Sequence, residues 1–275
     1  MSLALIAFAA SIAAGGFGSL VGIGGGLIIV PLLTIALGHD VKTAIAASLI
    51  GVIATSLSAS PRYIRSGIAD RRLGLLLLVV AALGGLTGGL TAGLLDDRVL
   101  ALLFGLLLSG VALHMLREIR HPSVAPPVDE DEHGSGFVSS YLEPTTGEVV
   151  TYQARRIGPG AAVSFAAGSI SGLLGVGGGV INVPTMNVLM HVPIRVATTT
   201  STYMLAATAT ASAVVYLASG QLDPLLAAPV ALGVIIGARL GARLSMRVSQ
   251  NALRLAFVAV AAFFAIGMFG QLLGL

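Results

Sequence analysis

Two glycine-rich blocks contain the first candidate ligand-binding residues of this sequence. GIGGG runs from Gly22 to Gly26 and GVGGG from Gly175 to Gly179, and a short apolar stretch follows each block. Clustered glycines weaken helices and allow φ > 0, so each block predicts a break between two helical segments. Free N–H groups at such a break can replace the hydration shell of an anion. We therefore interpret eight glycines as candidate anion ligands: Gly22, Gly24, Gly25, Gly26, Gly175, Gly177, Gly178 and Gly179.

Two other interpretations of these blocks exist. The glycines could serve only to let helices pack closely. A dinucleotide-binding turn is less consistent with the pattern, because GIGGGL lacks the third glycine of GxGxxG and follows an apolar helix instead of a strand.

A second set of polar residues is concentrated after the second glycine block. Ile29 and Thr34 near the first block correspond to Asn182 and Asn187 near the second, and the stretch IAASLI (45–50) corresponds to TTTSTY (198–203). We expect a polar pathway supplied mainly by the second half, although each Thr hydroxyl could instead bond to its own helix. The candidate lining residues are Ser48, Asn182, Asn187, Thr199, Thr200, Ser201 and Thr202.

An internal repeat positions these residues. The sequence from Ala14 matches the sequence from Ala167, and the same offset of 153 residues continues without a gap to Phe104 and Phe257. The first half shows five apolar stretches, at 3–21, 26–37, 43–64, 73–95 and 99–116, and the second half follows at the same offset. Because the second stretch is too short to cross a bilayer, we expect it to form a broken, re-entrant hairpin with the first.

The composition predicts a membrane protein. The chain of 275 residues is 56% hydrophobic and 10% charged, with a mean hydropathy of +0.96, whereas soluble domains carry about 25% charged residues. Repeated apolar stretches of membrane-spanning length indicate a polytopic α-helical bundle within a lipid bilayer. The basic residues lie mostly at the ends of these stretches, which favours a membrane over a nucleic acid as partner. Without cysteine and with five scattered histidines, the sequence predicts no metal and no cofactor.

A polar segment at 117–157 separates the halves, 1–116 and 158–275. It contains Pro126, Pro127 and the acidic run from Asp129 to Glu132, so we predict a solvated linker loop. Alternation in GEVVTYQARR after a Pro-Thr-Thr-Gly turn allows a small β-hairpin at its end.

The distribution of arginines predicts opposite orientations for the two halves. Arg62, Arg65, Arg71 and Arg72 surround the connection after the third stretch, whereas its equivalent around Ser219 has no basic residue. By the positive-inside rule the repeats are inverted, with the central loop cytoplasmic and both termini outside. The predicted fold is therefore all-α and polytopic: two inverted repeats, each a glycine-broken re-entrant hairpin plus three transmembrane helices.

The doubled glycine motif resembles that of the TauE/SafE sulfite exporter family. The resemblance is carried by the segments from Gly22 to Pro31 and from Gly175 to Pro184, with Ala-Ala-Ser-Leu (46–49) and Thr-Thr-Ser-Thr (199–202) after them. It implies a bacterial or archaeal inner-membrane permease that exports sulfite, sulfoacetate or another sulfur-containing or organic anion. The first half departs from the usual Thr-Ser pair with Ala47-Ser48, which argues against equal contributions of both halves to the site.

Export also agrees with elementary energetics. A negative interior drives anions outward with about 2.3 kcal/mol per charge per 100 mV, and the chain has no GxxxxGK[ST] motif for ATP. Both uniport and proton coupling fit the sequence. The alternatives are a passive anion channel or a transporter of an unrelated small anion; an intramembrane enzyme is not expected, because no nucleophile lies beside His114 or His191. A homo-oligomer is compatible with the sequence.

Overall fold

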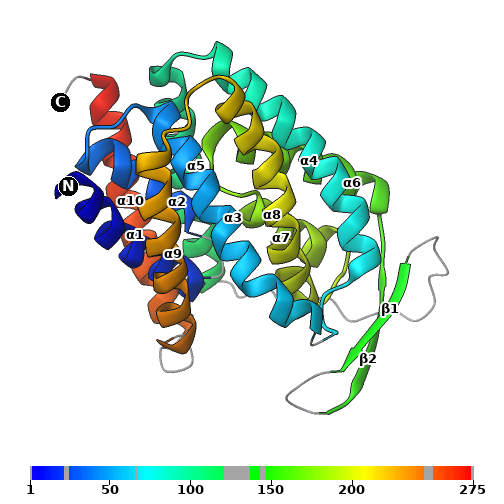
Figure 1. Ribbon diagram of the computed structural model, residues 1–275. Helices are drawn as coiled ribbons and strands as arrows, with labels where there is room; N and C mark the ends of the chain where they lie inside the picture. Colours follow the sequence, from blue (N-terminus) through cyan, green and yellow to red (C-terminus); the bar gives the residue numbers. More distant parts are fainter. Residues whose placement is uncertain are drawn as a thin grey trace.

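The computed structural model describes residues 2–21, 25–65, 67–120, 137–142, 147–244 and 250–273 (Figure 1). The first half consists of α1 (Ser2–Val21), α2 (Gly26–Pro31), the π-helical turn η1 (Leu32–Ala36), α3 (Val41–Arg65), α4 (Arg71–Leu94) and α5 (Asp97–Arg120). Two strands, β1 (Phe137–Leu142) and β2 (Val149–Ala154), precede the second half. That half consists of α6 (Ile157–Leu174), α7 (Gly179–Pro184), η2 (Thr185–Leu189), α8 (Ile194–Ala218), α9 (Pro224–Leu244) and α10 (Gln250–Leu273).

The sequence repeat is a structural repeat. The bounds of α2, η1, α3 and α5 recur in α7, η2, α8 and α10 after the same offset of 153 residues. The N-caps of the short helices also match, since Gly25 (φ 76°) and Gly178 (φ 55°) are both left-handed. The five predicted stretches of each half are thus confirmed as helical elements.

The first two stretches of the second half form a hairpin that enters and returns. Its break folds back on α6, because a Cβ on Gly178 would lie 3.4 Å from the Ala167 carbonyl. After η2 the chain returns to the start of α6: the Arg155 N–H, just before α6, donates to the carbonyl of Met190, just after η2 (3.0 Å). With only eleven residues, α7 and η2 together are too short to span a bilayer.

The halves exchange their first helices. Helix α1 packs along α9 of the other half, and α6 packs along α4. Small residues make these contacts close: a Cβ on Gly168 would lie 2.0 Å from the Ala81 carbonyl, and one on Gly237 would lie 2.1 Å from the Ile12 carbonyl. Helices without a water-driven hydrophobic force between them associate through such close packing.

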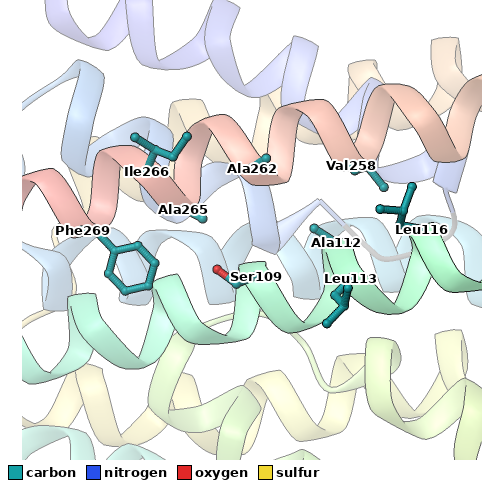
Figure 2. A pocket seen from close by; sticks show the side chains of 9 residues that line it. All are labelled: Ser109, Ala112, Leu113, Leu116, Val258, Ala262, Ala265, Ile266 and Phe269. Atoms are coloured by element: carbon teal, nitrogen blue, oxygen red, sulfur yellow. The ribbon is translucent and has the colours of Figure 1, made fainter.

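Equivalent helices of the two halves run antiparallel where they meet. In Figure 2, Phe269 lies near Ser109 at one end of the α5–α10 contact, and Val258 lies near Leu116 at the other. On α3 and α8 the equivalent residues Val52 and Leu205 both flank Gly177. Ser56 lies one turn after Val52, and it donates to the carbonyl of Thr202, which lies about one turn before Leu205. Inverted repeats require this geometry, but the orientation of each half in a membrane stays a prediction.

Six helical segments in the described part of the chain are long and apolar enough to cross a membrane: Val41–Ser58, Arg71–Leu94, Asp97–Arg117, Ile157–Leu174, Ile194–Ala218 and Pro224–Gly241. Helix α4 shows why a bilayer is required, because Leu75, Val79, Leu83 and Leu90 form an exposed apolar stripe along it. The predicted all-α polytopic membrane fold is confirmed.

The end of the linker is not the solvated loop that we predicted. The β-hairpin forms as the sequence allowed, but it packs against the helices, with Tyr141, Tyr152 and Ala154 buried. The Tyr152 hydroxyl donates to Asp70 Oδ2 (2.8 Å), while Oδ1 of Asp70 caps α4. Burial and then the bond to Asp70 raise the pKa of Tyr152, which keeps the phenol a donor. We did not expect this packing, because the buried side chains of the hairpin lie within a segment whose sequence is mostly polar.

The hairpin contact places two loops at the same end of the molecule. Asp70 belongs to the arginine-flanked connection between α3 and α4, so that connection and the linker hairpin lie together. The connection between α8 and α9 lies at the opposite end, as do the chain termini (Figure 1). This arrangement agrees with the charge-based topology, in which the first end is cytoplasmic.

We expect Gly168→Ala to destabilise the helix exchange. Its methyl group would overlap the backbone of Ala81, and overpacking of this kind costs about 1–3 kcal/mol. Gly110→Ala in α5 is the matched control, since a Cβ there has nothing within 4 Å and alanine favours a helix. Thermal unfolding in detergent measures both variants; equal melting temperatures would contradict the tight α4–α6 contact.

The topology can be tested at equivalent positions. Ser66→Cys and Ser219→Cys each introduce a single thiol, because the chain has no cysteine. An impermeant maleimide added to intact cells should label position 219 and spare position 66, while both should react after the membrane is permeabilised. Labelling of both positions in intact cells would mean that the repeats are parallel.

Candidate functional site

The two glycine breaks meet at the centre of the molecule. A Cβ on Gly26 would lie 2.6 Å from the Gly175 carbonyl oxygen and 3.1 Å from Cα of Val176. Only glycine fits this approach, because both neighbours are backbone atoms that cannot rotate away. All the glycines of the second block and both Gly25 and Gly26 are buried. The predicted juxtaposition of the breaks is therefore present in the fold, whereas Gly22 and Gly24 lie outside the described residues.

One serine hydroxyl joins the two breaks. Ser48 on α3 donates to the Gly175 carbonyl (2.9 Å) and lies 3.4 Å from the Gly26 carbonyl. Gly175 is the left-handed C-cap of α6, and its own N–H donates to the Ser171 carbonyl (2.7 Å). Ser48 thus satisfies a carbonyl that the end of α6 would leave unpaired. This contact makes Ser48 a structural residue of the breaks.

Apolar side chains enclose the junction on the helix-crossing side. Val52 and Leu205 flank Gly177, where a Cβ would lie 2.7 Å from Val52 and 3.4 Å from Leu205. Both side chains belong to the main hydrophobic core. Water is therefore displaced from this side, so any polar group at the junction must find its partner in the protein or in a ligand.

Three such polar groups lie at the second break. Ser171 on α6, Asn182 on α7 and Ser201 on α8 are each at most 1% exposed, and their Oγ, Oδ1 and Oγ atoms have no hydrogen-bond partner among the described residues. A Cβ on Gly178 would lie 3.6 Å from both Asn182 Nδ2 and Ser171 Cβ, and one on Gly179 would lie 3.4 Å from Ser201 Oγ. Three elements thus bring unpaired polar atoms to two adjacent glycines.

Unpaired buried polar atoms are costly, about 1–3 kcal/mol each. Proteins tolerate them mainly where a ligand, ion or water completes the bonding. We therefore interpret their convergence at the break as a candidate binding site.

The remaining predicted residues have structural partners. Thr199 and Thr202 bond to carbonyls of their own helix, as the alternative interpretation of each hydroxyl proposed. Thr200 Oγ1 accepts from the Asp70 N–H (3.0 Å), and Asn187 donates to the Val192 carbonyl (3.0 Å). Their role in binding stays a prediction without support from these contacts, and the proposed site excludes them.

Sequence analysis missed Ser171. Its repeat equivalent is Gly18, so Ser171 shows the same signal that drew attention to Asn182, a polar residue facing a nonpolar counterpart. The polar differences that we singled out from the sequence all follow the glycine blocks, whereas Ser171 precedes its block. A comparison along the entire repeat would have identified it.

A groove between α5 and α10 does not suit an anion. This groove of about 310 Å³ is lined by apolar side chains and Ser109 (Figure 2). The Ser109 hydroxyl already bonds to the Gly105 carbonyl (2.8 Å). Leu113 and Ile266 at its edge are exposed on the surface that faces lipid in a membrane-spanning bundle.

The fold and the broken helices define a multi-pass membrane transporter, as comparison with known proteins shows. The profile of the sulfite exporter TauE/SafE family matches residues 7–268, and the chain belongs to this family. The chain is also 30% identical over 227 residues to the "Probable membrane transporter protein YunE" of Bacillus subtilis (strain 168), which covers 80% of each chain. No solved structure matches the chain. The family and this relative indicate a transporter rather than an enzyme.

The equivalent serines Ser48 and Ser201 should differ in their effect on stability. Ser48→Ala removes a buried bond and should lower the free energy of unfolding by about 1 kcal/mol, which for a chain of this size lowers the melting temperature by about 2–4 °C. Ser201→Ala removes an unpaired group and should leave the melting temperature unchanged or raise it. An equal loss in both variants would mean that Ser201 is bonded as Ser48 is.

Proposed function

We propose that the protein is a secondary transporter that exports a small sulfur-containing or organic anion, such as sulfite or sulfoacetate, across the inner membrane. The observation that supports this most strongly is the convergence of Ser171, Asn182 and Ser201, unpaired and buried, on the junction of two glycine breaks. Family membership supports the substrate class, because its profile is that of sulfite exporters.

The chemistry of the site suits an anion. The hydroxyl groups of Ser171 and Ser201 and the amide of Asn182 can donate hydrogen bonds. Fixed donors replace the hydration shell without needing to reorganise, which lowers the cost of bringing the anion into the bilayer. No ATP is required, because the membrane potential drives an anion outward.

The arrangement of the hairpins supports alternating access. The second-half hairpin starts and ends at the end of the molecule that holds the β-hairpin, and its equivalent in the inverted first half enters from the opposite end. Their breaks touch through Gly26 and Gly175. Secondary transporters bind substrate where discontinuous helices of inverted repeats meet, and expose that site to each side in turn by moving one element against the other.

Gly178→Leu should abolish transport while the protein still inserts and folds. Leucine would occupy the space beside Asn182 and Ser171. Gly220→Leu is the matched control, because Gly220 also has a positive φ (71°) but has nothing within 4 Å of its Cβ position. Saturable uptake of labelled sulfite or sulfoacetate into inside-out vesicles measures both, with size-exclusion profiles to verify folding. Normal uptake by a well-folded Gly178→Leu protein would disprove the site; non-saturating flux would indicate a channel.

A further inference from the structure

The unpaired polar side chains at the junction come from the second half. The repeat equivalents of Ser171 and Asn182 are Gly18 and Ile29, which have no polar side-chain atom. The equivalent of Ser201 is Ser48, whose hydroxyl is already bonded to Gly175. Among the residues that the structure describes, the unbonded polar side chains at the junction therefore all belong to α6, α7 and α8.

These three side chains are neutral, and the elements that carry them contain almost no charge. Helices α6 and α7 have no ionisable residue, and the only basic residue of α8 is Arg195, which is exposed at its first turn; its other ionisable residues are Tyr203 and Tyr216. The facing helix α3 has Lys42, which donates to the Gly93 carbonyl, and the arginines of its last turn. The cost of burying an ion rises with the square of its charge, so a dianion costs about four times as much as a monoanion. Among the described residues of α6, α7 and α8, no cation other than Arg195 offsets this cost, which favours a monoanion over a dianion.

The amide of Asn182 adds a second requirement. In the orientation that the structure gives it, the amide presents its donors together with one acceptor oxygen, Oδ1, which is buried and has no partner among the described residues. An anion that has only acceptor atoms leaves this oxygen unpaired, whereas an anion with an O–H group can donate to it.

Resting on the proposed function, we infer that the site takes a small oxyanion in its singly charged, still protonated form. Ser171 and Ser201 donate to its charged oxygens, and its remaining O–H donates to Asn182. For sulfite this species is hydrogensulfite, not the dianion. Each transport event then moves one negative charge and carries one acidic proton with the substrate, without any titrating residue in the protein.

The test uses the purified full-length protein in liposomes. Uptake of labelled sulfite at a fixed total concentration should fall as the pH rises through its second ionisation, in proportion to the hydrogensulfite fraction. Liposomes with Gly178→Leu protein measure the leak of neutral sulfur dioxide. Methanesulfonate, a permanent monoanion without an O–H group, should compete about tenfold more weakly than hydrogensulfite, and sulfate should not compete.

A matched variant connects the selectivity to Asn182. Asn182→Ile installs the residue that the chain carries at the equivalent position of the first half, and it should reduce the tenfold preference for hydrogensulfite over methanesulfonate to about one. Ser171→Gly, made on the same principle, should weaken both anions equally. The inference is overturned if sulfate competes as well as hydrogensulfite, or if uptake follows the dianion fraction. Such results would leave the proposed transport intact, whereas absence of uptake for every anion would overturn both.

Discussion

The close approach of Gly26 to Gly175 determines how the two hairpins meet and where α3 and α8 cross. At 2.6 Å between a Gly26 Cβ position and the Gly175 oxygen, any side chain on Gly26 would separate the two breaks. Their contact lets one hydroxyl, that of Ser48, serve the carbonyls of both hairpins. It also sets the level at which α3 and α8 cross, through Val52 and Leu205 beside Gly177. The break therefore packs the two hairpins together and, in the proposed site, also holds the ligand, so the two interpretations of the glycines are not exclusive.

The exchange of first helices explains how a break at the centre can be stable. Each hairpin is held by a helix of the opposite half, α1 by α9 and α6 by α4, so neither repeat packs its own hairpin alone. Glycines at these contacts bring the backbones together and make the positions of the hairpins rigid. In the proposed alternating access, one exchanged pair would move against the α3–α8 crossing, because each pair is too tightly packed to separate.

The sequence predicted the helices well because the repeat supplied each of them twice. A stretch ambiguous in one half, such as the short α2, was supported by α7 at the same offset. Side-chain partners were less predictable. Nothing in the sequence distinguishes Thr200, which accepts from Asp70, from Thr199, which bonds to its own helix, since both depend on the rotation of α8 and on the fold of a distant loop. The docking of Tyr152 onto Asp70 was missed for the same reason: it joins residues 82 positions apart.

Divergence within the repeat follows from the location of the junction. In the proposed site, a small ligand near the pseudo-two-fold axis that itself lacks two-fold symmetry cannot bond equally to both halves. Polar residues on both sides would leave one set unpaired, at about 1–3 kcal/mol for each buried group. Ser48 and Ser201 illustrate the solution, since one is bonded within the protein and the other is unpaired at the break. In the proposed site, one half thus supplies the wall of the junction and the other the donors, which accounts for a duplicated sequence that retains its glycines but not its polar residues.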